Sequence, residues 1–287
     1  MQNYRLALKK ELYVITFLKM ADILTGSHSK HRRVTVEYTN IKIVCLDDND
    51  KSLNYFDLAV LHAINTIFMQ TEGLRRFRVL NILKLITANS KAHFSSSSKK
   101  NRTITMKLII GSIKKLSCFR LISVGGQCLE NEKLVSILIT SDYLEFENEP
   151  ALVEIYHRKM IPSLHMKVIT FDDFSIKPNN KQNYIHQSIG VIAFKTGMLS
   201  QILEVNDQIE LPISKLKVIL GLNENESQII KKYKDKKISY SLYIKQLRDL
   251  NKRFFSCYFY PYLDSLRKAQ LICDYRIVGD VVTIMRN

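Results

Sequence analysis

The sequence predicts an α+β protein with two domains of one design, a basic helix followed by a β-hairpin. Two observations lead to this prediction. A ten-residue pattern occurs twice, at 113–122 and 263–272; in each copy a branched apolar residue is followed by leucine three residues later, and Leu-Ile ends the copy. The positive charge of the chain is also concentrated in two blocks that lead into or contain these copies.

The spacing within the pattern locates the end of each helix. Apolar residues three apart share one face of a helix, whereas adjacent apolar residues further on suit a strand. The helices are therefore predicted to end within 116–121 and within 266–271. A β-hairpin should follow each helix, the first within 121–140 around a long loop that starts with glycine, the second within 271–285 around Gly279-Asp280.

Two shorter helices are expected before the first basic helix. Apolar residues at helical spacing mark a helix over about 52–73, with Asn54 as a candidate cap, and a second helix over about 77–86. The polar stretch 88–101 contains four consecutive serines and is expected to be a flexible loop. Before these helices, 33–45 suits a short hairpin.

A helix that feeds a two-stranded hairpin and follows two shorter helices resembles the winged-helix fold, a helix-turn-helix variant. In that family the helix before the hairpin enters the major groove of DNA, and the hairpin is the wing. The resemblance implies tandem winged-helix domains at 51–177 and 178–287, after an N-terminal extension at 1–50. The polar stretch Pro178–Asn183 is the candidate linker.

The second domain is expected to repeat the helical elements of the first. Residues 189–203 suit either a strand or a helix, and a later helix should stop at Gly221. An aromatic cluster at 254–262 leads into the final helix, where Pro261 fits the first turn. Further helices are predicted over 211–220, 226–237 and 239–250.

The net charge of the chain is +16, and its distribution favours a polyanionic partner. The 57 residues from Gly73 to Leu129 contain twelve Lys or Arg and no acid, and residues 231–253 contain nine Lys or Arg against two acids. A low-GC genome would raise the lysine content, but it does not explain so long a stretch without an acid. We therefore expect binding to nucleic acid, stabilised by phosphate neutralisation and counterion release.

The first basic helix should have a threonine cap, Thr103 or Thr105, and carry apolar residues inward at positions 108, 109, 113 and 116. Base reading is expected from Arg102, Asn101 or Thr105, because lysines contact phosphate well but read bases poorly. The DNA-binding residues that the resemblance implies are Lys99, Lys100, Arg102, Lys107, Lys114, Lys115, Lys252, Arg253, Arg267 and Lys268.

Patterns of catalytic and cofactor sites are missing from the sequence. There is no ATP-binding or dinucleotide-binding glycine loop, no H-E-x-x-H and no G-x-S-x-G. We therefore expect no enzymatic activity, no catalytic residue, no cofactor and no metal. Scattered cysteines without a C-x-x-C pair suggest reduced thiols, and no apolar run is long enough to span a bilayer, so a cytoplasmic protein is expected.

Tandem winged-helix modules with basic helices resemble plasmid replication initiators and related proteins of bacterial mobile elements. The resemblance implies a sequence-specific, double-stranded DNA-binding protein that binds origin repeats, recruits host replication proteins and can form a homodimer. Two alternatives stay open: a transcriptional regulator of the same fold, and a metal-dependent nuclease or recombinase that uses Glu154 near Lys159, Asp142 and Glu145. The aromatic cluster could stack on single-stranded bases or form a dimer interface, although a place in the core is favoured.

Overall fold

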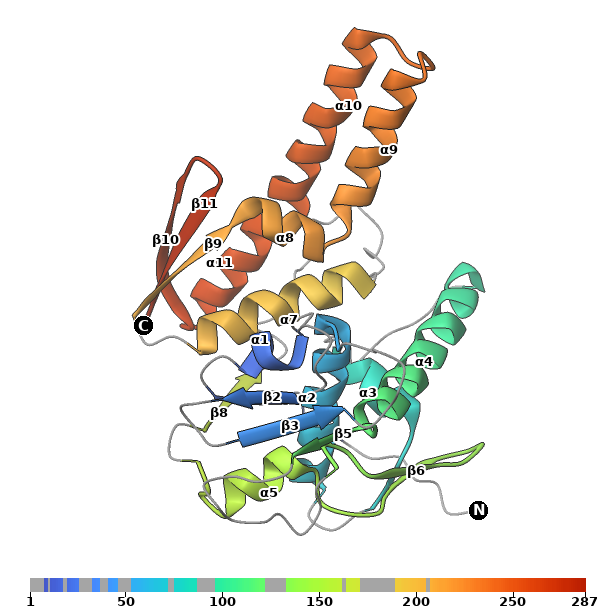
Figure 1. The fold of residues 1–287 in the computed structure, drawn as a ribbon, viewed down its shortest axis with the longest axis vertical. Helices are drawn as coiled ribbons and strands as arrows, with labels where there is room; N and C mark the ends of the chain where they lie inside the picture. The colour runs from blue at the N-terminus through green and yellow to red at the C-terminus, as the bar shows by residue number, and fades with distance from the viewer. Residues whose placement is uncertain are drawn as a thin grey trace. The chain divides into compact units, whose positions relative to one another are not determined.

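The chain has an α+β fold of helices and small antiparallel sheets, seen in a computed structural model (Figure 1). It divides into two compact units, residues 1–172 and 173–287. The predicted boundary at 177/178 and the candidate linker Pro178–Asn183 lie outside the described residues. The structure describes residues 8–9, 11–17, 20–25, 33–36, 41–45, 53–71, 75–86, 96–121, 133–161, 164–170, 189–204 and 207–287.

The first unit contains three short antiparallel sheets, β1-β8, β2-β3-β5 and β4-β7-β6. Its elements in chain order are β1 (Glu11–Thr16), α1 (Met20–Thr25), β2 (Arg33–Val36), β3 (Ile41–Cys45), α2 (Tyr55–Gln70), β4 (Arg76–Phe77), α3 (Val79–Ile86), α4 (Ser96–Leu116), β5 (Phe119–Leu121), β6 (Ile137–Ile139), β7 (Leu144–Phe146), α5 (Ala151–His157) and β8 (His165–Thr170).

Helix α2 is the centre of this unit. Every residue from Phe56 to Ile67 is buried, because β1, α3 and α4 all pack against the helix. Its start is fixed by a capping box: the Asn54 side chain accepts hydrogen bonds from the backbone N–H groups of Phe56 and Asp57, and the Asp57 carboxylate accepts one from the backbone N–H of Asn54. The predicted helix and its cap are confirmed.

The N-terminal segment contributes to the core of the first unit. Val14 and Ile15 in β1 are fully buried, and β1 pairs along its length with β8. Thr66 of α2 accepts a hydrogen bond from the backbone N–H of Tyr13 (2.9 Å), which ties β1 to the central helix. The predicted hairpin at 33–45 is confirmed as β2 and β3. Strand β1 pairs with β8, and β3 also pairs with β5, so both strands belong to sheets of the first unit.

Helix α4 starts earlier than the sequence predicts. Residues Ser96 to Lys100, placed in a polar loop by the sequence, form its first turns, so the helix does not begin at a threonine cap. Hydrophobic periodicity cannot separate a polar helical turn from a loop, which explains the error. The end at Leu116 agrees with the prediction, and Ile109 and Ile113 are fully buried as expected. Leu108 was expected to face inward but is 40% exposed.

The strands after α4 pair differently from the prediction. Strand β5 pairs with β3, and only an isolated bridge from Arg120 to Lys133 joins it to the chain beyond. Strand β6 pairs instead with β7, which the sequence analysis did not assign. Gly125-Gly126, the expected start of the loop, lies outside the described residues. The long-range partner β3 lies more than seventy residues before β5, too distant for a local turn signal to indicate it.

The second unit contains one three-stranded antiparallel sheet of order β10-β11-β9 and a set of helices. Its elements in chain order are α7 (Ile189–Leu203), β9 (Gln208–Pro212), α8 (Ile213–Ile219), α9 (Leu222–Lys234), α10 (Tyr240–Arg253), η1 (Phe254–Phe259), α11 (Tyr260–Lys268), β10 (Ile272–Val278) and β11 (Val281–Arg286).

Several predictions for the second unit are confirmed. Residues 189–203 form a helix, α7, and α8 stops before Gly221, which has a left-handed backbone. The final helix ends at Lys268 and feeds the hairpin β10–β11, whose turn has Gly279 at φ 59°. Gly190 permits close packing of α7 on α8, since a β-carbon there would lie 2.5 Å from the backbone oxygen of Leu220.

The chain from Tyr240 to Lys268 is one continuous helical segment that contains a π-helical part, η1. Pro261 is the second residue of α11, two residues after the end of η1; proline lacks the N–H that a regular helix uses, and a π-helical turn adapts the hydrogen bonds around it. Phe254, Phe259 and Tyr262 are fully buried, and the Tyr262 hydroxyl donates to the backbone oxygen of Lys195 (2.8 Å). The interpretation of the aromatic cluster as core is confirmed for these three residues.

The two units share an order of elements. In the first, the helix α2 is followed by strand β4, helices α3 and α4, strand β5, which belongs to another sheet, and strands β6 and β7; in the second, α7 is followed by β9, α8, further helices, β10 and β11. In both sheets the third of these strands lies between the first and the second, as β4-β7-β6 and β9-β11-β10. The second unit adds α9 and α10 within this order. No described helix of either unit is long and apolar enough to cross a membrane.

Candidate nucleic-acid interface

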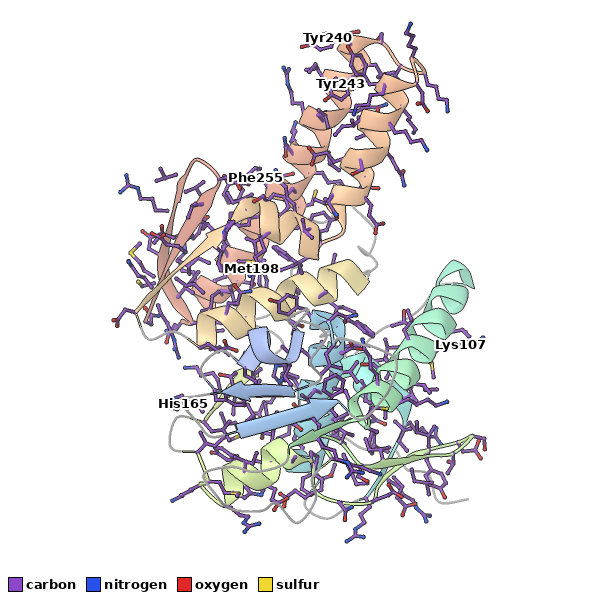
Figure 2. All side chains as sticks on the ribbon, viewed as in Figure 1. Lys107, His165, Met198, Tyr240, Tyr243 and Phe255 are labelled. Carbon is purple, nitrogen blue, oxygen red and sulfur yellow. The ribbon has the colours of Figure 1, made fainter. Side chains whose placement is uncertain are left out.

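The outer face of α4 carries two of the predicted DNA-binding lysines. Lys107 and Lys114 are exposed, and Gly111 between them is exposed as well (Figure 2 labels Lys107). Residues four and seven apart share a helix face, and the fully buried Ile109 and Ile113 occupy the opposite side. The two lysines are about 10 Å apart along the helix axis, at 1.5 Å per residue.

Gly111 leaves the helix backbone bare between these lysines. A β-carbon at this position would meet nothing within 4 Å, so no packing contact inside the described structure requires glycine here. Glycine in a helix interior costs about 1 kcal/mol relative to alanine. The bare backbone allows another molecule to approach this face more closely than any side chain would permit.

Lys115 does not belong to this outer face, although the sequence placed it among the DNA contacts. Its ammonium group donates to the carboxylate of Asp57, whose side chain is only 5% exposed. The Ser112 hydroxyl donates to the other carboxylate oxygen of Asp57 (2.8 Å). Lys115 therefore joins α4 to α2 and does not lie on the outer face with Lys107 and Lys114. The ion pair links residues 58 positions apart, so the local sequence carries no signal for it.

The remaining predicted residues of the first unit also lie on α4. Lys99, Lys100 and Arg102 are in its N-terminal half, and their side chains are not among those described. Of the predicted base readers, Thr105 is half-buried and the Asn101 side chain is not described. Thr103, which the sequence suggested as a cap, is exposed and lies four residues before Lys107, on the same outer face.

The predicted basic residues of the second unit form two exposed pairs on one continuous helical segment. Lys252 and Arg253 end α10, and Arg267 and Lys268 end α11. The pairs are fifteen residues apart, or about 22 Å along a helix. This exceeds the width of the major groove, about 12 Å, so the two pairs can reach different phosphate backbones. Arg267 also forms an exposed ion pair with Asp264 (3.3 Å).

Polar and aromatic side chains lie between these two pairs. Ser256 is exposed, and Tyr260 is 40% exposed. The Tyr260 ring contacts the ring of Tyr275 in β10, with centroids 6.4 Å apart, which connects the helix to the following hairpin. Burial raises the pKa of Tyr275, and the negative charge of Asp264 raises it further, so its phenol stays neutral at physiological pH.

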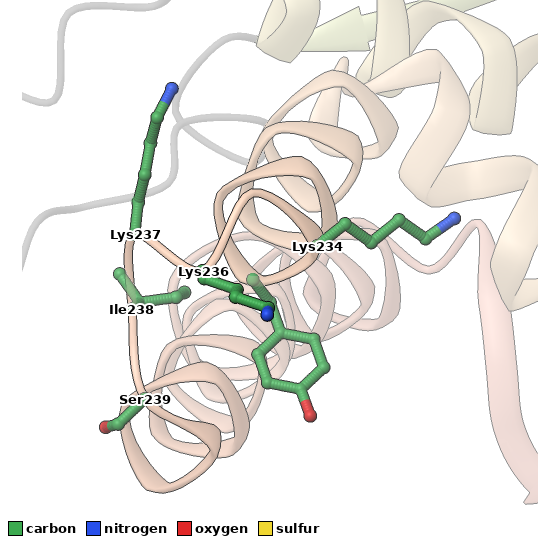
Figure 3. A pocket seen from close by; sticks show the side chains of 6 residues that line it. Lys234, Lys236, Lys237, Ile238 and Ser239 are labelled. Atoms are coloured by element: carbon green, nitrogen blue, oxygen red, sulfur yellow. The ribbon is translucent and has the colours of Figure 1, made fainter.

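A third basic surface lies at the turn between α9 and α10, within the basic block at 231–253. Figure 3 shows a shallow pocket there, lined by Tyr233, Lys234, Lys236, Lys237, Ile238 and Ser239. The available signal was the presence of Tyr233, Tyr240 and Tyr243 in the same short stretch, 231–243, as five lysines. The charge distribution identified the lysines, but it carries no information on the neighbouring tyrosines.

The residues suggested for a nuclease site are not arranged to hold a metal. The Glu154 side chain is 6% exposed and accepts a hydrogen bond from the Arg158 guanidinium (2.7 Å). Glu145 pairs with Arg76 (3.0 Å). Within the described ranges no group of three or more His, Cys, Asp or Glu could hold a metal ion.

Comparison with known proteins assigns no family to the chain. No protein-family model, curated protein or solved structure matches it. The site is therefore interpreted from two features of the molecule itself. These are the order of elements that both units share apart from β5, and the exposed basic residues on α4 and on the segment from α10 to α11.

Proposed function

We propose that the chain is a sequence-specific, double-stranded DNA-binding protein with two winged-helix modules. The single observation that supports this most is the order of helix, strand, helices and two strands, which both units share apart from β5 of the first, with the third strand central in both sheets. A winged helix has a helix-turn-helix followed by a hairpin, and the helix before the hairpin enters the major groove. The corresponding helices here are α4 and the segment from α10 to α11.

In the first module, the outer face of α4 is the proposed contact with DNA. Lys107 and Lys114 bind phosphates, and the bare backbone at Gly111 lets the helix lie close to the duplex between them. Lys99, Lys100 and Arg102 extend the basic helix toward its N-terminus. Asp57 holds α4 on α2 through Ser112 and Lys115, so the orientation of this face is fixed by buried contacts.

In the second module, the exposed pairs at the ends of α10 and α11 bind the two sugar-phosphate backbones that border one groove. Lys252 and Arg253 contact one backbone, and Arg267 and Lys268 contact the other. Ser256 and Tyr260 lie between the pairs, at the position where base edges are reached. The hairpin β10–β11 follows directly and is the proposed wing, with the exposed Arg276 on it.

We infer replication initiation on a mobile element as the biological role. The two modules differ, since among the described residues the inserted hairpin α9–α10 occurs in the second alone, and two unlike modules in one chain suit a composite site without dyad symmetry. Origin repeats are sites of this kind, and a homodimer or host replication proteins would join at them. A transcriptional regulator could use the same surfaces, and the position of the bound site relative to an origin or a promoter separates the two roles.

In vitro selection of bound duplexes tests this function. The full chain, incubated with random duplexes of about 40 base pairs, should enrich a site with two different motifs, because two unlike helices read it. Two variants provide reciprocal controls. The double variant Lys107→Ala with Lys114→Ala should lose selection for one of the two motifs and keep selection for the other. The double variant Arg267→Ala with Lys268→Ala should show the reverse. No enrichment after repeated rounds, or a palindrome read by one module, would contradict the proposal.

A further inference from the structure

Three tyrosines form an exposed cluster at the end of the α9–α10 hairpin. The rings of Tyr233 and Tyr243 are stacked, with centroids 4.6 Å apart and planes at 19°, and Tyr240 lies 6.0 Å from Tyr233. Tyr240 is 64% exposed and Tyr233 is 38% exposed. Figure 2 labels Tyr240 and Tyr243 at this end of the hairpin. The cluster thus presents aromatic faces to solvent.

These tyrosines do not serve a hydrophobic core. Helix α10 contains no buried residue, and Leu222 is the single buried residue of α9. The two helices lie side by side and extend beyond α8 and α11 (Figure 1). Such a hairpin exposes most of its surface: the Tyr233–Tyr243 stack joins its two helices, and Tyr240 remains largely exposed beside that stack.

The same end of the hairpin is strongly basic. Five lysines occur within seven residues, with Asp235 as the single acid among them: Lys231, Lys232, Lys234, Lys236 and Lys237. All five are exposed, and the ion pair between Lys237 and Asp235 (3.2 Å) involves exposed side chains. In Figure 3, Lys234 and Lys237 extend in different directions from the turn. A ligand that crosses the tyrosines therefore meets positive charge on several sides.

Lys236 has an unfavourable backbone conformation at the turn. Its φ is 55°, in the left-handed region that glycine adopts without strain. A lysine in this conformation costs about 1–2 kcal/mol relative to its relaxed state. Lys236 also lines the shallow pocket, of about 590 Å³, together with Tyr233 and Ile238. A charged side chain is thus present where the backbone favours glycine, next to an aromatic ring.

We propose that this surface, Tyr233, Tyr240 and Tyr243 with the five lysines, binds single-stranded DNA. The tyrosines stack on unpaired bases, and the lysines neutralise the phosphates between them. Bases within a duplex are already stacked on one another, so the tyrosines select a strand that is open. The choice of DNA over RNA rests on the proposed function, in which the chain binds the duplex from which such a strand is opened.

Anisotropy of a labelled strand of twelve thymidines, titrated with the full chain, tests the proposal. Tyr233→Leu with Tyr240→Leu keeps apolar side chains in the cluster but removes the aromatic faces, and should weaken binding roughly tenfold to a hundredfold. Lys236→Gly relaxes the turn while removing a charge, so it should keep the hairpin folded, weaken binding and reduce the salt dependence. Neither variant should change the affinity for the selected duplex.

A fluorescent reporter tests the location of the bound strand directly, without relying on a variant that binds more weakly. The chain has no tryptophan, so Tyr240→Trp introduces a single indole, which should retain binding and be quenched when the thymidine strand is added. Tyr156→Trp, in the first unit, is the matched control and should not be quenched.

Full binding by the tyrosine variant, or an unquenched indole at position 240, would overturn the proposal. A change in self-association without a change in strand binding would also overturn it, in favour of a protein contact. Equal or tighter binding of twelve uridines would overturn the assignment to DNA. If the chain bound no duplex while the tyrosine variant still lost strand binding, the proposed function would fail and this site would stand.

Discussion

Replacing Asp57 with alanine should lower the free energy of unfolding by about 3 kcal/mol, the largest effect that we expect from one substitution. The carboxylate completes the capping box of α2 and accepts hydrogen bonds from Ser112 and Lys115 of α4. Loss of a cap costs about 1 kcal/mol, and leaving a buried hydroxyl and a largely buried ammonium group without their partner adds about 2 kcal/mol or more. Urea unfolding of the full chain, followed by circular dichroism, measures the difference.

Two further variants separate the buried contact from a general charge effect. Adding Lys115→Met to Asp57→Ala should recover about 1 kcal/mol, because the unpaired ammonium group is then absent. Asp235→Ala removes an acid from an exposed ion pair and should cost less than about 0.5 kcal/mol. If Asp57→Ala cost no more than this surface variant, Asp57 would not be the residue that joins α2 to α4.

Acidification should selectively weaken the first unit through His62. This side chain is 1% exposed, neither ring nitrogen has a hydrogen-bond partner among the described residues, and burial lowers its pKa to about 4 from 6.5. Between pH 6.5 and pH 4 the unfolded chain binds a proton at His62 that the folded chain does not bind. The contribution of neutral His62 to the free energy of unfolding is therefore complete above pH 6.5 and is lost as the pH falls toward 4. The loss is about 3 kcal/mol at 1.36 kcal/mol per pKa unit.

Unfolding of His62→Leu across this pH range measures that contribution. The stability difference between the variant and the wild type should grow by about 3 kcal/mol from pH 7 to pH 4, since leucine does not titrate. Asn65→Leu is the matched control: Asn65 is also fully buried without a described hydrogen-bond partner, but it carries no titratable group. Its difference from the wild type should not depend on pH. Parallel profiles for His62→Leu and Asn65→Leu would show that His62 has no such role.

Elements whose signals are local were predictable from the sequence. The start of α2 follows from Asn54 and the apolar spacing after it, and the ends of α4 and α11 follow from the change of period in the repeated pattern. The hairpin β10–β11 follows from two apolar runs around Gly279-Asp280. In each case neighbouring residues determine the structure, so a single sequence is sufficient.

Features that depend on distant partners were not predictable. The pairing of β5 with β3 and of β1 with β8 joins segments far apart in the chain. For the same reason the sequence did not predict the position of Lys115. This residue follows the exposed Lys114, but its ammonium group is paired with the Asp57 carboxylate on α2. Among the candidate site residues, exposure therefore distinguishes Lys107 and Lys114 from Lys115, and exposure was accessible only from the fold.

The most direct test of the central claim, that α4 and the α10–α11 segment are the two duplex contacts, is the salt dependence of duplex binding. The affinity of the full chain for a selected duplex, measured by anisotropy over a salt series, gives a slope of about 0.9 for each phosphate contact. Lys107→Ala with Lys114→Ala should lower the slope by about 2, and Arg267→Ala with Lys268→Ala should lower it by a similar amount.

The control, Lys159→Gly with Lys167→Ala, removes two positive charges from exposed positions that belong to neither helix, and glycine suits the left-handed backbone of Lys159. The proposed function predicts that this control keeps the wild-type slope while both helix variants lose about two contacts each. Equal slopes for all four proteins, or an equal loss in the control, would contradict it.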